Sequence, residues 1–202
     1  MRKEEKEKLL NHKSKYISIG ITDDGIAYNG FGIPWESTSN AYNMRLPDVF
    51  ITPDDLNDEE TMSLIRSKKV IGCYCWSSLE NFDFVSHFSD IEDVNIFKGE
   101  NLKNIDFVKS LKELRMLFVG NAKFDNIDAI LEIPKSDGQF IRMMNIGLYN
   151  CEVKDLSTFL EKEHKFYEFL VWNRKEKIER KKWQVVSALK RKIYEIESEL
   201  IR

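Results

Sequence analysis

The sequence predicts an α/β fold: a solenoid of short parallel strands, with a small β-meander plus helix before it and a long helix after it. Three observations support this architecture. Pairs of apolar residues separated by one position recur along the middle of the chain, and the first three pairs are 23 residues apart. A second apolar cluster follows each pair, and the composition changes sharply after residue 173. A recurrence of about 20 to 29 residues is typical of stacked strand-plus-helix units.

The recurring pairs mark the expected strands of the repeat. They are Ile71 and Cys73, Val94 and Ile96, Leu117 and Val119, then more loosely Met144 and Ile146, and Phe169 and Val171. In each unit the pair points inward, and a helical or irregular return packs behind it, as expected for Phe107 and Val108. Because no unit can bury its apolar face alone, adjacent units must stack, and their strands then form a parallel sheet.

Three segments are expected along the chain. Residues 1–69 form the N-terminal β-meander and capping helix, residues 70–173 the solenoid, and residues 174–202 a C-terminal capping or interaction helix. The last segment lacks Gly and Pro and carries apolar residues at helical spacing, which indicates one long helix. A solenoid needs covers at both ends, and the first and last segments would supply them.

The N-terminal segment begins with mostly charged residues, which we expect to be frayed or helical. Alternating apolar residues indicate strands near 15–21, 26–31 and 46–51, with a turn at Asp23-Asp24-Gly25 between the first two. A helix is expected from Thr52, which can cap it, because Pro53 suits the first helical position and two acids follow. This helix is expected to end near residues 67–69.

A known family pattern fits two of the copies. The first comprises Leu114, Leu117, Val119, Ala122 and Phe124, and the second comprises Ile91, Val94, Ile96, Gly99 and, after one extra residue, Leu102. On these residues the middle of the chain resembles the bacterial leucine-rich repeat family. The resemblance implies a ladder of asparagines that bond the backbone of neighbouring turns, at the places of Ala122 and Gly99. Here Asn121 is one place early and Asn101 two places late, which implies an irregular ladder.

The residues beside each inward pair are expected to point out from the concave face of the sheet. The predicted protein-binding residues on that face are Tyr74, Asn95, Phe97, Phe118, Asn145 and Trp172. Four of them are aromatic, and aromatic residues supply much of the energy at protein interfaces. The alternative is that the N-terminal segment or the C-terminal helix covers these rings as part of the chain's own packing.

Composition and charge argue against several function classes. The chain has 31 basic and 34 acidic residues, a net charge of −3, so no overall basic excess predicts nucleic-acid binding. Residues 174–192 hold nine basic and two acidic side chains, a local +7 that we interpret as the solvated face of a capping helix. No run approaches the about 18 apolar residues that span a membrane, and the charged N-terminal residues lack the apolar core of a signal peptide. A cytoplasmic location without a membrane partner is therefore expected.

Catalysis and cofactor binding are not expected from the motifs. No Gly-rich phosphate loop, nucleophile motif or zinc-ligand spacing is present, so no cofactor and no metal are predicted. Cys73 and Cys75 lie two apart in an expected strand, which disfavours a bridge between them. Together with Cys151 they indicate reduced thiols in a reducing compartment.

The sequence therefore predicts a non-catalytic protein-binding module. A more specific hypothesis is a bacterial immunity or adaptor protein that binds one protein partner through the concave face. Two alternatives stay open. One is a self-associating structural protein, a homodimer formed through the C-terminal stripe or the concave face. The other is an enzyme with its site in the N-terminal segment, where Trp35, Tyr42 and Asp48 lie in loop-like sequence.

Overall fold

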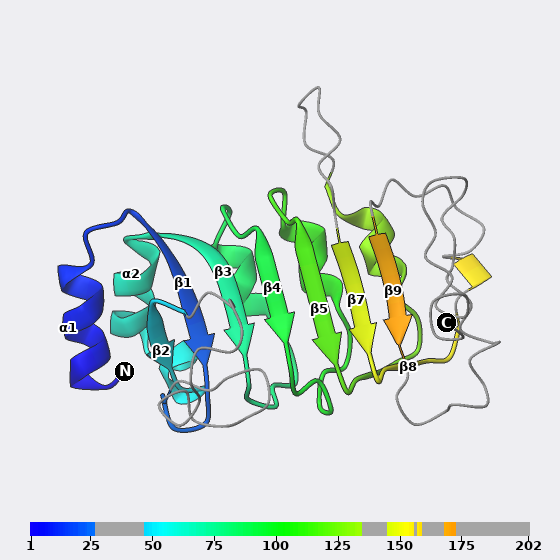
Figure 1. Cartoon of the computed structure of the whole chain (residues 1–202), viewed down its shortest axis with the longest axis horizontal. Coiled ribbons are helices and arrows are strands. Elements are labelled where there is room, and N and C mark those ends of the chain that lie inside the picture. The colour runs from blue at the N-terminus through cyan, green and yellow to red at the C-terminus, as the bar shows by residue number, and fades with distance from the viewer. Residues whose placement is uncertain (27–46, 135–144, 156, 159–167, 173–202) are drawn as a thin grey trace, which may run out of the picture.

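The computed structural model describes residues 1–26, 47–134, 145–155, 157–158 and 168–172. Within this part of the chain, parallel strands form one large sheet in the order β2-β1-β3-β4-β5-β7-β9 (Figure 1). Its strands are β1 (Tyr16–Ile21), β2 (Val49–Ile51), β3 (Lys69–Cys75), β4 (Asp93–Ile96), β5 (Met116–Gly120), β7 (Asn145–Tyr149) and β9 (Glu168–Trp172). A second, two-stranded parallel sheet pairs β6 (Lys123–Phe124) with β8 (Glu152–Val153). The predicted mixed α/β fold with a parallel sheet is confirmed.

The helical segments of the described residues are short. They comprise two α-helices, α1 (Lys3–Asn11) and α2 (Glu59–Arg66), and the 3-10 turns η2 (Asp54–Asn57), η3 (Asp83–His87), η4 (Asp106–Ser110) and η5 (Asp128–Glu132). The strands lie side by side along the long axis of the molecule, and the coils between successive strands lie behind the sheet (Figure 1). The predicted C-terminal helix, residues 174–202, lies outside the described residues.

Backbone pairing fixes which positions of successive strands are equivalent. Cys73 pairs with Val94, Val94 with Leu117, and Leu117 with Ile146. All four side chains are almost completely buried. Because side chains alternate between the two faces of a strand, these residues fill the face that the return turns cover, and their neighbours in sequence point the other way.

Each return turn starts with a short asparagine motif that repeats along the chain. Three asparagine side chains accept a hydrogen bond from the backbone N–H two residues further on; they are Asn81, Asn104 and Asn126. Such Asx-turns fix the direction of the chain without a helix. The residue after each asparagine is buried in the core, and these residues are Phe82, Ile105 and Ile127. The motif therefore sets where η3, η4 and η5 begin and which side chain each turn buries.

The predicted N-terminal β-meander is wrong for the described strands. β1 pairs in parallel with both β2 and β3, so the first strands belong to the same sheet as the repeats. Burial explains this arrangement, because Ile17, Ile19 and Ile21 are fully buried and Ser18, on the opposite face, is buried as well. A strand that is buried on both faces suits the interior of a parallel sheet. The expected returning strand at 26–31 falls almost entirely outside the described residues.

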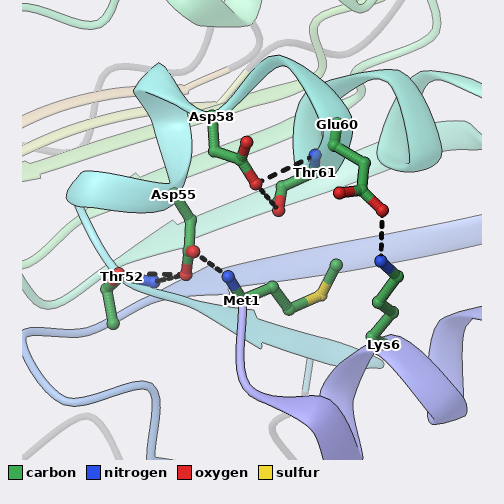
Figure 2. A network of polar contacts seen from close by, with 7 residues as sticks. All are labelled: Met1, Lys6, Thr52, Asp55, Asp58, Glu60 and Thr61. Atoms are coloured by element: carbon green, nitrogen blue, oxygen red, sulfur yellow. Dashed lines mark hydrogen bonds and ion pairs between the residues drawn. The ribbon is translucent and has the colours of Figure 1, made fainter.

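The helix expected from Thr52 begins later than predicted. Thr52 does not cap it; instead, its N–H and hydroxyl donate to Asp55 Oδ2 at 2.8 and 2.9 Å and close the turn η2. The capping residue of α2 is Asp58, whose Oδ2 accepts hydrogen bonds from the N–H and the hydroxyl of Thr61, at 3.2 and 2.5 Å (Figure 2). The observed end of α2 agrees with the expected one to within one residue.

Helix α1 covers the edge of the sheet at β2. The buried carboxylate of Glu5 accepts a hydrogen bond of 2.7 Å from the N–H of Phe50, which lies on the edge strand. Two ion pairs tie α1 and the residues before it to the η2–α2 segment: the Met1 ammonium with Asp55, and Lys6 with Glu60 (Figure 2). The unpaired backbone N–H and C=O groups of an edge strand can pair with a further strand. Helix α1 therefore protects the β2 edge of the sheet from such pairing.

Candidate functional site

A row of aromatic rings crosses the sheet on the face opposite to the return turns. The rings belong to β3, β5 and β7 or to the residue that directly follows β3 and β4. They are Tyr74, Trp76, Phe97, Phe118 and Tyr149, and together we call them the aromatic row. All five positions alternate with core residues along their strands, so the sheet geometry places them on one surface.

The aromatic row is continuous from β3 to β7. Trp76 stacks on Phe97 with ring centroids 4.9 Å apart and planes at 16°. Phe97 lies 5.7 Å from Phe118, and Phe118 lies 6.4 Å from Tyr149. Tyr74 stacks on Trp76 at 6.3 Å. These separations fall in the range of about 4.5–7 Å at which aromatic pairs attract each other, so the rings support one another laterally.

Glycines beside the rings let them lie against the sheet. A Cβ added at Gly72 would come within 3.0 Å of the Tyr74 ring, and one at Gly147 within 3.3 Å of the Phe118 ring. The space that a side chain would fill above these backbones is therefore taken by the neighbouring rings. The rings of Tyr74 and Phe118 therefore lie low over the sheet, and both are half-buried.

Exposure varies along the aromatic row. Tyr74, Phe97, Phe118 and Tyr149 are half-buried, whereas Trp76 is only 6% exposed. The indole N–H of Trp76 is buried and has no hydrogen-bond partner in the described part of the chain.

The structure brings most of the predicted binding residues together. Tyr74, Phe97 and Phe118 belong to the aromatic row, while Asn95 lies between Tyr74 and Phe118 in register and is only 8% exposed. Asn145 pairs with Met116, in the same register as Asp93 and two residues before the register of Tyr74 and Phe118. Trp172 pairs with Tyr149 in backbone register, and that register is all that the described structure gives for it.

Trp76 and Tyr149 are the members of the row that the sequence analysis missed. The recurrence of 23 residues in the sequence predicts that Cys73 lies opposite Ile96. In the sheet Cys75 pairs with Ile96, so the predicted register between β3 and β4 is wrong by two residues. A shift of two keeps every side chain on its face, because the side-chain period of a strand is two. The predicted residues therefore stayed on the correct surface, while their neighbours across the sheet were assigned wrongly.

An asparagine pair holds the ends of the strands that carry the row. Asn121 donates from Nδ2 to the carbonyl oxygen of Phe97 at 3.0 Å, and Asn150 donates from Nδ2 to Asn121 Oδ1 at 2.7 Å. Both residues have left-handed backbones, with φ of 60° and 53°. These hydrogen bonds form a short asparagine ladder between neighbouring turns, at the positions that continue the register of Lys98. The hydrogen bond from Asn121 to the carbonyl of Phe97 helps to position the Phe97 ring.

A carboxylate that makes no hydrogen bond within the described residues lies on the face of the aromatic row. Asp93 begins β4 and points to the same side as Asn95 and Phe97. Burial raises the pKa of Asp93 above its ordinary value, the neighbouring charge of Glu92 raises it further, and Arg115 partly opposes the rise. No hydrogen bond or ion pair holds Asp93 within the described residues, so its charge is only poorly compensated there.

The cysteines do not form a reactive site. Burial raises the pKa of Cys73 well above its ordinary value, that of Cys75 to about 12 and that of Cys151 to about 11. All three are free thiols and stay protonated near neutral pH.

In the N-terminal segment, Asp48 accepts hydrogen bonds from the N–H and hydroxyl of Ser18, which is a structural role. Trp35 and Tyr42 lie outside the described residues.

Neither a metal centre nor a relative identifies the site. Among the described residues, no group of three or more His, Cys, Asp or Glu side chains could hold a metal ion. None of the helices described here is both long and apolar enough to pass through a bilayer. No family model matches the chain, and no curated protein or solved structure matches it.

Proposed function

We propose that this chain is a non-catalytic protein-binding module that takes one partner protein on the aromatic row. The observation that carries the proposal is the continuous contact of five rings over β3, β4, β5 and β7, four of them half-exposed. Well-packed aromatic clusters with partly exposed faces supply the anchors of protein interfaces. A more specific form of the proposal is an immunity or adaptor protein that blocks its partner.

The proposed scaffold is a solenoid of the leucine-rich-repeat type. Parallel strands that follow one another in the sheet in chain order, from β3 to β9, support it. The repeated asparagine turns and the pair Asn121 and Asn150 support it as well. Solenoids present extended surfaces that bind proteins, which agrees with a row of rings laid across several units.

Charge favours a protein partner over a nucleic acid. The chain carries 34 acidic against 31 basic side chains, a net charge of −3, so it lacks the overall basic excess on which nucleic-acid binding depends. The three free thiols agree with the cytoplasmic location that we propose, because a reducing compartment keeps cysteines unpaired.

The test compares two forms of the chain as bait in lysate of the organism that encodes it. The variant carries Phe97→Ser and Phe118→Ser, which remove two half-buried rings of the row. We expect one protein to be retained by the wild type and lost by the variant, and to bind at a 1:1 ratio when purified. Thermal unfolding of both baits shows whether the variant still folds.

Two results would contradict the proposal. If the double variant unfolds at markedly lower temperature and no retained protein differs, the rings serve the chain's own packing. If the wild type has twice its monomer mass in solution and the variant has not, the row is a homodimer interface. The second result would favour the self-associating structural protein instead.

A further inference from the structure

Asp93 stands next to the aromatic row without a partner of its own. The backbone register places it between Gly72 on β3 and Met116 on β5. Glycine offers no side chain and Met116 carries no charge, so neither neighbour can neutralise the carboxylate. Among the described residues the nearest basic group that acts on it is Arg115, which is already paired with Glu92.

An aromatic ring lies beside this carboxylate. The ring of Tyr74 folds back over Gly72, since a Cβ at that glycine would lie 3.0 Å from Tyr74 Cε2. Gly72 pairs with Asp93 in the sheet. The Tyr74 ring, which lies over Gly72, is therefore adjacent to the Asp93 side chain on this face. A cation at this place is attracted by the negative charge of the carboxylate and by the quadrupole of the aromatic ring.

The partner-facing surface therefore combines a poorly compensated negative charge with an apolar platform. Basic side chains of proteins have matching properties, because arginine and lysine carry a charged end on an apolar stem.

Building on the proposed function, we propose that the partner is a protein segment that presents an arginine or lysine side chain to Asp93. Apolar residues of the same segment then lie on Phe97 and Phe118. In the complex the cation donates to the Asp93 carboxylate and stacks beside the Tyr74 ring. Asp93 thus sets which partner is accepted, while the rings supply most of the buried area.

The experiment pans a random dodecapeptide library on the immobilised full chain in three forms. These forms are the wild type, Asp93→Asn, and the double variant Phe97→Ser with Phe118→Ser. The strongest peptide is then synthesised with its basic residue intact and with that residue replaced by a neutral isostere, citrulline for arginine. Fluorescence anisotropy gives the affinity of both peptides for each form, and Asp83→Asn on η3 serves as the matched control carboxylate.

We expect wild-type selections to be enriched in arginine or lysine beside apolar residues. The affinity should fall about tenfold or more in Asp93→Asn and by a similar factor with citrulline, with no further loss when both changes are combined. Asp83→Asn should leave the affinity unchanged, because its carboxylate lies on a return turn. Asp93 makes no hydrogen bond among the described residues, so Asp93→Asn should fold as the wild type does.

Two outcomes would overturn the inference, and they separate it from the proposed function. If the selected peptides lack basic residues, or bind Asp93→Asn as well as the wild type, but are lost by the double variant, the aromatic row binds proteins without this charge pair. If no peptide depends on either Asp93 or the rings, both the inference and the proposed function fail.

Discussion

The indole of Trp76 stacks on the phenyl ring of Phe97 across two adjacent strands, with centroids 4.9 Å apart and planes at 16°. Each residue directly follows its strand, β3 or β4. The stacking joins two structural units at the point where the sheet ends, and Phe50 adds a further ring on the other side of Trp76 at 6.4 Å. Trp76 is thus the centre around which the exposed rings are arranged.

Removing this centre should be costly. Trp76→Ala is expected to lower the free energy of unfolding by about 3–5 kcal/mol, because a large, almost fully buried side chain leaves a cavity. Urea denaturation measures the loss. Leu10→Ala, at a side chain that is 59% exposed on α1, should change stability by less than about 0.5 kcal/mol. A loss below about 1 kcal/mol for Trp76→Ala would show that the indole is not packed as described.

Two glycines should respond differently to the same substitution. A Cβ at Gly99 would lie 2.8 Å from the backbone oxygen of Gly120, which cannot move away without breaking the turn. Gly99→Ala should therefore cost about 1–3 kcal/mol. Gly147→Ala meets only the Phe118 ring, at 3.3 Å, and a side chain can rotate. This variant should cost less than about 1 kcal/mol but shift the ring resonances of Phe118 in NMR spectra; equal losses would contradict the distinction.

The face of each repeat strand could be predicted from the sequence, because the alternation of side chains survives an error of two residues. Tyr74, Phe97 and Phe118 were placed on the correct surface for this reason. The alignment across the sheet could not be fixed from apolar pairs alone, since the loop between β3 and β4 is shorter than the recurrence suggests. Trp76 was therefore missed, although it follows Cys75 just as Phe97 follows Ile96.

Other features depend on contacts between distant parts of the chain. The parallel pairing of β1 and β2 was not predictable from alternation, because short apolar strands look alike in parallel and antiparallel sheets. The placing of rings over Gly72 and Gly147 depends on which strand lies alongside. Asn121 was judged to be out of place because the left-handed turn that lets it reach Phe97 is a property of the folded backbone.

Asn121 combines two roles that substitution can separate. Asn121→Gly keeps the left-handed backbone but loses the hydrogen bond to Phe97, which should cost about 1 kcal/mol. Asn121→Ala loses the hydrogen bond and also forces a Cβ into a backbone with φ of 60°, which should add about 1–2 kcal/mol. Urea denaturation of both variants tests this order. If alanine is no worse than glycine, the left-handed backbone is not maintained in solution.

The network at the β2 end of the sheet should weaken in acid. Burial raises the pKa of Asp55, but hydrogen bonds from the Met1 ammonium and Thr52 lower it, and the net pKa lies below its ordinary value. Its stabilising effect is therefore complete above the unfolded pKa of about 3.9 and is lost as pH falls through the lower folded pKa. The difference in unfolding free energy between wild type and Asp55→Asn should be constant from about pH 5 to about pH 7 and shrink below pH 5. A difference that is unchanged at about pH 3 would contradict this role.

Asp93 should titrate in the opposite sense. Its pKa in the folded chain is raised, chiefly by burial, so the folded chain takes up the proton before the unfolded chain does. At neutral pH its charge therefore lowers stability, and Asp93→Asn should unfold at a higher urea concentration than the wild type. This advantage should begin to shrink as pH falls through the raised pKa and vanish below the unfolded value of about 3.9.

The pKa of Asp93 also bears on binding. A charge that lowers the stability of the free chain is typical of a residue whose function requires that charge. A peptide whose basic residue contacts Asp93 favours the ionised carboxylate and should lower its pKa. NMR titration of the Asp93 carboxyl carbon, with and without the selected peptide, measures this change. If the pKa of Asp93 is ordinary in the free chain, its charge does not lower the stability of the fold. If the peptide does not lower this pKa, the basic residue of the peptide does not contact Asp93.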